Sequence, residues 1–168
     1  MTGRGQFTIR DGVADDARAV SEVRSDVAAE GRWLGTEPPV DIDRSMQAYL
    51  EVLADESSHT VVAVDDSGSV IGSISMFTVL PGVTTFGMWV VREQRRRGVG
   101  SALVSAVLAW SRDRGAHKVI LEVWPHNEAA IALYTAHGFV REGLRPKHYR
   151  RRNGDLWDVV EMGLVLSD

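Results

Sequence analysis

The sequence predicts an α/β fold in which a single mixed β-sheet carries helices on both faces. Apolar runs of strand length alternate with amphipathic helical stretches along the chain. The segments Asp65-Asp66-Ser67-Gly68 and Asn153-Gly154 are turn signals between apolar runs, so they indicate antiparallel hairpins. Two strand–helix units favour parallel neighbours as well. A chain of 168 residues without repeats or linkers suits one domain, residues 1–168.

The first half of the chain is predicted to place two helices between strands. The first helix has an apolar stripe at Ala19, Val23 and Val27, which is the spacing of one helical face. Gly31 and Pro38-Pro39 then interrupt the helical pattern. The expected elements are a strand at Phe7–Arg10, a helix from Asp15 or Asp16 to about Glu30, a helix capped by Asp41 or Asp43, and strands at Thr60–Asp65 and Ser69–Phe77.

The second half is predicted to alternate strands and helices before a final hairpin. Pro81-Gly82 marks a turn, and Gly138 can end a helix in the left-handed conformation. The expected elements are a strand ending at Val91, a helix ending near Arg114, a strand at Lys118–Trp124, a helix from about Glu128 to Ala136, and strands near Val140–Arg145 and Leu156–Leu166.

Composition excludes several classes of function. The net charge of −4 argues against bulk nucleic-acid affinity, and no apolar run reaches membrane-spanning length. The absence of cysteine excludes disulfides and thiol nucleophiles, and the five histidines lack metal-ligand spacing, so no metal is expected. The opening residues Met1–Gln6 show no apolar signal region, so we expect a cytoplasmic protein.

The segment Arg95–Ser101 (Arg-Arg-Arg-Gly-Val-Gly-Ser) joins an apolar strand to an amphipathic helix. Free backbone N–H groups and the positive end of the helix dipole attract anions, and Gly98 and Gly100 permit close approach to the backbone. The segment therefore predicts a phosphate or pyrophosphate site. It lacks the Gly-Lys-Ser/Thr ending of a P-loop, and Leu103 occupies the place of the third glycine in a dinucleotide fingerprint.

A second segment, Asn127–Phe139, is informative together with the first. An asparagine, an alanine, a leucine–tyrosine pair and a glycine–phenylalanine pair follow the Arg-x-x-Gly-x-Gly pattern at a typical distance. The two segments resemble the motifs of the GNAT superfamily of N-acetyltransferases, over roughly Ile71 to Val165. The matching residues are Arg95, Gly98, Gly100, Asn127, Ala130, Leu133, Tyr134, Gly138 and Phe139.

The resemblance implies a GNAT-like acyl-CoA N-acyltransferase fold and acetyl-coenzyme A (acetyl-CoA) as the donor substrate. It implies that the central sheet splays between the strands ending at Val91 and Trp124. It also implies that the N–H groups of Arg96–Ser101 bind the pyrophosphate and that the Met88 N–H holds the thioester carbonyl. The expected cofactor-binding residues are Met88, Trp89, Val90, Val91, Arg95, Arg96, Arg97, Gly98, Val99, Gly100, Ser101, Asn127, Ala129, Ala130 and Tyr134.

The expected catalytic residues are Tyr134, Met88 and Asp158. Tyr134 resembles the family tyrosine that faces the coenzyme A sulfur, and a protonated phenol can donate to a departing thiolate; a packing role is the alternative. Asp158 lies on a predicted apolar strand face, where a carboxylate needs a partner or a task. A salt bridge or a hydrogen bond to the backbone is the alternative for Asp158.

The general base is not evident from the sequence. Many family members carry a glutamate on the strand that corresponds to Val83–Val91, which has no carboxylate here. Glu122 flanks the expected gap, with pairing to an arginine as the alternative. Glu30, Trp33 and Glu37 are the expected acceptor-binding residues, because this region forms part of the acceptor pocket in many members; surface or core positions are the alternative.

We therefore expect an N-acetyltransferase that transfers acetyl from acetyl-CoA directly to a primary amine of a small molecule. A ternary complex is expected because no cysteine can carry the acetyl group. The alternatives are a protein N-terminal or lysine acetyltransferase, an enzyme with a longer acyl donor, and a non-catalytic acyl-CoA-binding regulatory module. Neither nucleic acid nor membrane is an expected partner, and a homodimer is left open.

Overall fold

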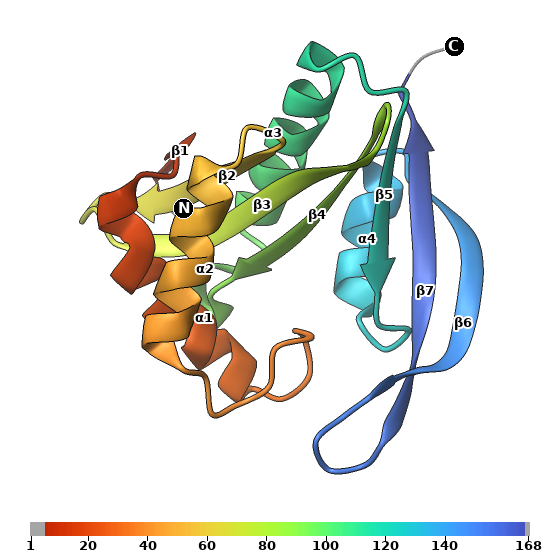
Figure 1. Ribbon diagram of the computed structural model, residues 1–168, viewed down its shortest axis with the longest axis horizontal. Helices are drawn as coiled ribbons and strands as arrows, with labels where there is room; N and C mark the ends of the chain where they lie inside the picture. The colour runs from red at the N-terminus through yellow and green to blue at the C-terminus, as the bar shows by residue number, and fades with distance from the viewer. Residues whose placement is uncertain (1–5, 167–168) are drawn as a thin grey trace, which may run out of the picture.

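The computed structural model describes residues 6–166, whose strands form one seven-stranded sheet in the order β1-β2-β3-β4-β5-β7-β6 (Figure 1). Within this sheet β4 and β5 are parallel and the other neighbours are antiparallel, which confirms the predicted mixed α/β fold. The expectation about the first residues concerns positions 1–5 and lies outside the described part. The strands are β1 Phe7–Asp11, β2 Ser58–Asp65, β3 Val70–Leu80, β4 Val83–Val90, β5 Lys118–Val123, β6 Val140–Arg150 and β7 Leu156–Val165.

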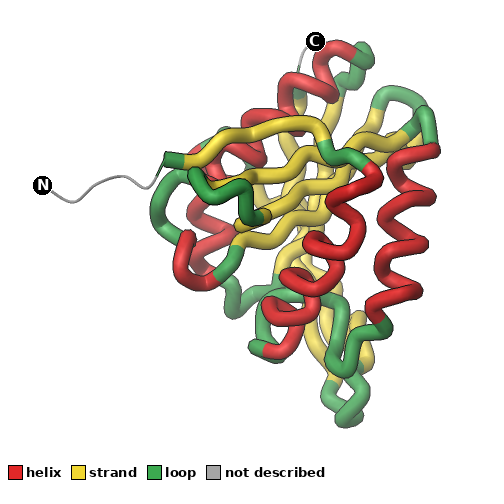
Figure 2. The backbone as a smooth tube through the Cα atoms, turned by 90° about the vertical axis from the view of Figure 1, so that its left-hand side faces the viewer, coloured by secondary structure: helices red, strands yellow, loops and turns green. Residues whose placement is uncertain are grey.

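Helices cover both faces of the sheet. Strand residues alternate between the faces, so the core is divided in two. On β2, Val61 packs in a cluster with Leu103 of α3, whereas the next residue, Val62, packs in a cluster with Val20 of α1. Figure 2 looks onto the face that α1 and α2 cover. The helices are α1 Ala17–Ala29, α2 Ile42–Ala54, α3 Val99–Asp113 and α4 Glu128–Ala136.

The structure decides between the capping residues that the sequence left open. Asp41 caps α2, because its Oδ1 accepts a hydrogen bond from the Arg44 N–H at 3.0 Å. Asp16 occupies the N-cap position of α1 without capping it. Its carboxylate instead accepts hydrogen bonds from the Arg10 guanidinium at 2.7 Å and from the Val13 N–H at 2.9 Å.

β6 is longer than predicted. Pro146 cannot donate a ladder hydrogen bond, which favours an end at Arg145, yet the strand continues to Arg150 through a register shift. Lys147 has a φ of +50°, and its N–H donates to Asp158 Oδ1 at 2.7 Å. The carboxylate on β7 thus holds the irregular part of β6 in place.

The sheet splays between β4 and β5. The two strands pair only over Val83–Thr85 with Lys118–Ile120 and then diverge, as Figure 1 shows. This confirms the predicted gap and leaves the second half of β4 with a free edge. Within residues 6–166, no helix is both long and apolar enough to cross a membrane.

Candidate functional site

The turn before α3 presents a row of free backbone N–H groups. Gly98, the N-cap of α3, has a φ of +92°, and Arg96 has a φ of +64°. Among the described residues, the N–H groups from Arg96 to Ser101 have no hydrogen-bond partner; the Ala102 N–H is bonded to the Gly98 carbonyl at 3.0 Å. With the helix dipole behind them, these N–H groups are oriented to attract an anion.

The free edge of β4 offers further backbone groups. The Val91 N–H binds the Ile71 carbonyl of β3 at 2.9 Å, and backbone groups alternate in direction along a strand. The N–H groups of Met88 and Val90 therefore point away from β3, into the gap beside β5. The Val90 carbonyl also points away from β3, where it accepts a hydrogen bond from Arg95 Nε at 3.0 Å.

A cavity of about 500 Å³, the α3–α4 cavity, lies between the start of α3, α4 and β4. Of the residues predicted to bind the cofactor, Val91, Arg97 and Val99 are outside its described lining; Val99 is buried in the core and Arg97 is exposed. The cavity thus brings the two sequence motifs together. The predicted residues that line it are Met88, Trp89, Val90, Arg95, Arg96, Gly98, Gly100, Ser101, Asn127, Ala129, Ala130 and Tyr134.

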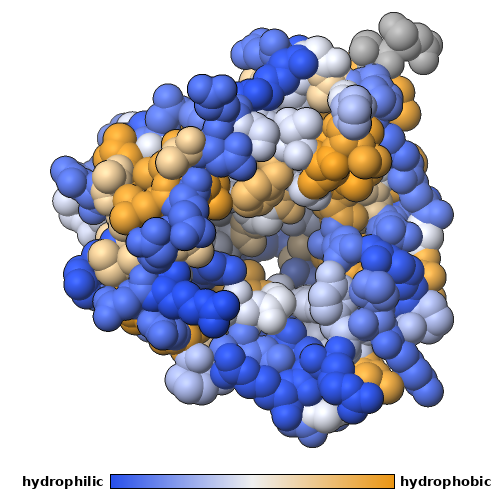
Figure 3. All heavy atoms as spheres, viewed as in Figure 1, coloured by the Kyte–Doolittle hydropathy of each residue, from blue (hydrophilic) through white to orange (hydrophobic). Residues whose placement is uncertain are grey.

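A second cavity, of about 570 Å³, lies beside α1 and α2 and is also lined by β3, β4, β5, β6 and the loop after α1. We refer to it as the α1–α2 cavity. Figure 3 shows this face of the molecule hollowed between the half that carries α1 and α2 and the half formed by β6 and β7. The two cavities share several lining residues, Met88 and Tyr134 among them, so they adjoin at these positions.

Tyr134 lies on α4 with only 7% of its surface exposed, and its ring makes edge contacts with Phe86 and Phe139 at centroid distances of 5.7 and 6.0 Å. Burial raises the pKa of its hydroxyl above the usual tyrosine value, so the phenol stays protonated at neutral pH. Asn127 begins the same helix, and its Oδ1 accepts a hydrogen bond from the Ala130 N–H at 3.2 Å. The asparagine of the second motif therefore positions Tyr134 by capping α4.

Glu122 is the one carboxylate among the described residues that line the α1–α2 cavity. It accepts hydrogen bonds from the Tyr149 hydroxyl and from Arg145, so the predicted arginine pairing is present. The hydrogen bond to Glu122 raises the pKa of Tyr149, which favours the protonated phenol. A carboxylate and a tyrosine from strands far apart in the sequence thus share one wall of this cavity.

Glu30 binds Arg95 and Trp33. Arg95 donates to both carboxylate oxygens of Glu30, at 2.9 and 2.5 Å, and Trp33 Nε1 donates to the same carboxylate at 2.7 Å. The Arg95 guanidinium lowers the pKa of Glu30. Trp33 lines both cavities, whereas Glu30 is outside the described lining of each.

Glu37 joins the loop after α1 to the β6–β7 hairpin. It accepts hydrogen bonds from the Arg152 N–H at 3.1 Å and lies 3.6 Å from Arg151 Nε. Arg151, only 6% exposed, also donates to the carbonyls of Leu34 and Gly35 at 3.3 Å. Because Leu34 and Gly35 line the α1–α2 cavity, this arginine holds part of the cavity wall.

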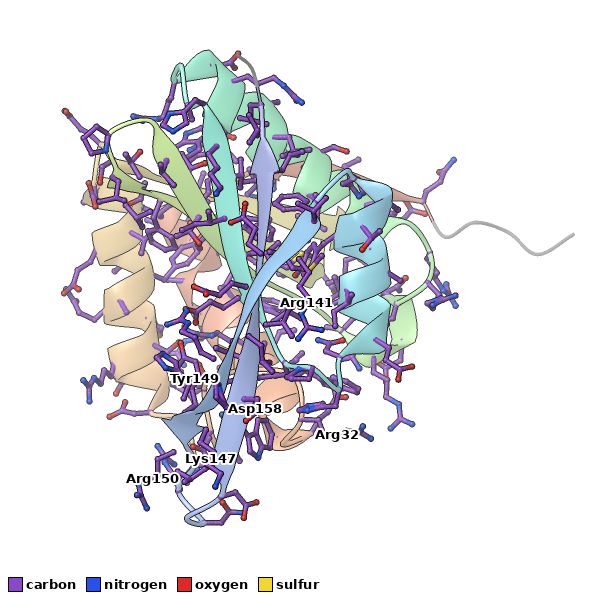
Figure 4. All side chains as sticks on the ribbon, turned by 90° about the vertical axis from the view of Figure 1, so that its right-hand side faces the viewer. Arg32, Arg141, Lys147, Tyr149, Arg150 and Asp158 are labelled. Atoms are coloured by element: carbon purple, nitrogen blue, oxygen red, sulfur yellow. The ribbon has the colours of Figure 1, made fainter. Side chains whose placement is uncertain are left out.

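Asp158 is outside the described lining of both cavities. Figure 4 shows Asp158 and Tyr149 near the hairpin end of β6 and β7, but only Tyr149 is among the described residues that line the α1–α2 cavity. The Asp158 carboxylate accepts the Lys147 N–H, as described above. This bond corresponds to the alternative of a backbone hydrogen bond, and a catalytic role for Asp158 stays a prediction.

The splayed sheet, with free amides on one side of its gap, matches the fold of solved acetyltransferases. The acetyltransferase (GNAT) family matches residues 23–139, and the chain belongs to this family of acyltransferase enzymes. It is 27% identical over 165 residues to an L-methionine sulfoximine/L-methionine sulfone acetyltransferase of Pseudomonas paraeruginosa, covering 95% of each chain.

Two further similarities are informative. The chain is 35% identical over 89 residues to the ribosomal protein bS18-alanine N-acetyltransferase of Escherichia coli, covering 53% of this chain and 60% of that one. Its fold matches the structure of a GNAT superfamily phosphinothricin acetyltransferase from Sinorhizobium meliloti in complex with acetyl-CoA. The TM-score is 0.85 at 24% identity, over 96% of this chain and 89% of that chain.

The residues of the α1–α2 cavity that sequence reasoning missed include Arg24 on α1 and Tyr149 on β6. Arg24 stands among charged residues of an amphipathic helix, and Tyr149 stands within a run of basic residues beside Asn153-Gly154. No local spacing distinguishes either from a surface residue. Only the packing of α1 and β6 around the gap places them in one cavity.

Proposed function

We propose that this chain, as one domain, transfers an acetyl group from acetyl-CoA directly to a primary amine of a small molecule. The observation that carries the proposal is the meeting of the two cavities at Met88 and Tyr134. One cavity offers backbone donors suited to a pyrophosphate, and the other offers side chains suited to an amine. Direct transfer needs both reactants present at one point.

The α3–α4 cavity fits acetyl-CoA. The unpartnered N–H groups from Arg96 to Ser101 would hold its pyrophosphate, and the free edge of β4 would pair with its amide-containing arm as an added strand. The Met88 N–H, which points into the gap, would donate to the thioester carbonyl oxygen. When bound, acetyl-CoA supplies an activated acetyl group as a thioester.

Two side chains would move the protons. A primary ammonium must lose a proton before it can form the new C–N bond, and we assign the base to Glu122, the carboxylate of the α1–α2 cavity. Tyr134 would donate its hydroxyl proton to the sulfur as the C–S bond breaks, and the second proton that the nitrogen loses would restore the phenol. Glu122 takes the base role in place of Asp158, because Asp158 is not among the described residues that line either cavity.

A small acceptor is supported by the tie between the loop after α1 and the β6–β7 hairpin. Arg151 and Glu37 link these two segments beside the α1–α2 cavity. The loop and the hairpin therefore hold each other in place, which limits the room for a large acceptor. The similarity to a protein named as an acetyltransferase of methionine sulfoximine, over 95% of both chains, supports the same conclusion.

The test is release of free coenzyme A thiol from acetyl-CoA, with a panel of small primary amines and a set of peptides with free N-termini. We expect thiol release with small amines and a loss of about 100-fold in kcat for Glu122→Gln. Release with peptides alone would favour a protein acetyltransferase. Binding of acetyl-CoA without release with any acceptor would contradict the proposal and favour a regulatory module. A parallel reaction with a succinyl donor tests the acyl group.

A further inference from the structure

Arg24 differs from the other arginines around the site. Arg95, Arg145 and Arg151 each have a carboxylate partner, whereas no carboxylate oxygen of residues 6–166 lies within 4.0 Å of the Arg24 guanidinium. The side-chain partner of Arg24 is the neutral hydroxyl of Thr36, at 2.6 Å. Arg24 is thus a cation at a cavity wall without a compensating charge from the described chain.

Burial makes this cation receptive to an anion. Arg24 is largely removed from solvent, and burial alone lowers its pKa, with no nearby carboxylate to oppose the effect. A guanidinium carries five N–H donors in a planar fork that matches a carboxylate, and Thr36 takes one of them. A carboxylate from a ligand would supply both the missing charge and the missing acceptors.

The surroundings of Arg24 are those of a small polar site. Thr36, Ser45 and Ser75 line the same cavity with hydroxyl groups, and Glu122 is its acidic residue. Trp89 and Phe77 add apolar surface between the polar groups. The cavity therefore offers a cation, an anion and an apolar wall, which is the complement of a molecule with a carboxylate, an ammonium and a carbon skeleton.

We propose that the acceptor is a free amino acid or a close analogue, and that Arg24 binds its carboxylate while its amine lies toward Glu122 and Met88. This proposal rests on the proposed function, because it names the acceptor of the same transfer. Arg24 determines specificity and takes no part in the chemistry. A peptide N-terminus, whose first carboxyl group is an amide, lacks the group that Arg24 binds.

The experiment compares L-amino acids with their α-carboxamides, which keep the amine and the side chain but lose the negative charge. For the wild-type enzyme we expect kcat/KM to be about 10- to 100-fold higher for the acids, the value of one hydrogen bond between charged groups. Arg24→Met should raise KM for the acids by about 10-fold or more, with kcat little changed and the carboxamides unaffected. Arg24→Lys should restore part of the preference.

Arg18→Met is the matched control. Arg18 lies on the same helix, is exposed, and makes only a surface pair with Glu22 at 3.4 Å, so its loss should leave the preference for acids intact. Equal use of acids and carboxamides by the wild type, or equal losses for both in Arg24→Met, would overturn the proposal.

Calorimetric binding of the same pairs to enzyme saturated with coenzyme A separates this proposal from the proposed function. Binding of acids but not carboxamides, without any acetyl transfer, would support the Arg24 subsite and refute the transfer. Acetyl transfer without a preference for acids would support the transfer and refute the subsite. Acids and carboxamides that are bound equally and turned over equally would also refute the subsite.

Discussion

The two cavities that meet at Tyr134 are built in different ways. The α3–α4 cavity presents backbone N–H groups from the continuous segment Arg96–Ser101 and from the free edge of β4. The α1–α2 cavity presents side chains from α1, the following loop, α2, β3, β5 and β6. A site made of backbone needs only the correct conformation, whereas a site made of side chains can change its specificity one residue at a time. This difference suits a fold that holds one donor and varies the acceptor.

The two cavities differ in charge as well. Of the two arginines that line the α3–α4 cavity, Arg95 is already neutralised by Glu30, so Arg96, the free amides and the helix dipole are left to attract an anion. In the α1–α2 cavity the charges are separate, with Arg24 unpaired and Glu122 held by Tyr149 and Arg145. Substitutions in one cavity should therefore leave binding in the other largely unchanged.

The largest effect is expected from Gly98→Val. The φ of +92° at this position is unfavourable for a branched side chain, so the amides of the loop would lose their present orientation. The dissociation constant of acetyl-CoA should rise by about 100-fold in calorimetry, through loss of charge-assisted hydrogen bonds.

Gly68→Val is the control for Gly98→Val. Gly68 has a φ of +82° in the β2–β3 turn, and a Cβ atom would meet nothing within 4 Å at either glycine. It carries the same backbone strain away from the site, so it should lower Tm without weakening acetyl-CoA binding. Equal affinities for the two variants would contradict the role of the amide row.

Tyr134→Phe tests the point where the cavities meet. Loss of the hydroxyl removes a proton donor but keeps the ring contacts with Phe86 and Phe139. We expect kcat to fall by about 10- to 100-fold. This is at or below the low end of the usual contribution of a general acid, because a thiol is already a fair leaving group. The affinity for acetyl-CoA should not change. An unchanged kcat in steady-state kinetics would defeat the assignment.

Arg151→Met should affect the acceptor side alone. The variant removes the contacts to Leu34 and Gly35 and leaves the partly buried Glu37 carboxylate without its cationic partner, so we expect a loss of about 3 kcal/mol in the free energy of unfolding. KM for the acceptor should rise by about 10-fold, because the loop would no longer be held. Chemical denaturation and kinetics measure the two effects. Arg150→Met, at an exposed neighbouring position, is the control. A weaker acetyl-CoA affinity in Arg151→Met would contradict an effect on the acceptor side alone and show that the two cavities are coupled.

The smallest effect is expected from Glu30→Gln, which breaks the contact between α1 and the loop before α3. The pKa of Glu30 is lowered in the folded protein from its ordinary value of 4.5. Its contribution to stability is therefore present above about pH 4.5 and is lost as the pH falls through the lower, folded-state value. The free energy of unfolding of the wild type should exceed that of Glu30→Gln by about 1 kcal/mol at pH 7, and this difference should shrink below pH 4.5. A difference that stays constant down to pH 3 would refute an ionic origin.

Local signals were sufficient for most of the fold. Helix α4 was predicted at its observed bounds, because Asn127 and Gly138 mark its ends, and both hairpins followed from turn residues that adopt positive φ. β6 was predicted too short, because Pro146 ends a strand in isolation. In the structure the pairing with β7 resumes at Tyr149 and Trp157 after a register shift, and the Lys147 N–H bonds to Asp158 within the shifted part.

The sequence by itself determined the sheet, the family and the row of amides before α3, because glycines and helix starts act within a few residues of one another. The tertiary structure decided which side chains line the α1–α2 cavity, where we propose that the acceptor binds. It engaged Glu30 with Arg95 and Glu37 with Arg151, placed Glu122 against Tyr149, and left Arg24 without a counter-charge. Such pairings join residues tens of positions apart, and their energies depend on distance and burial, which no local pattern encodes.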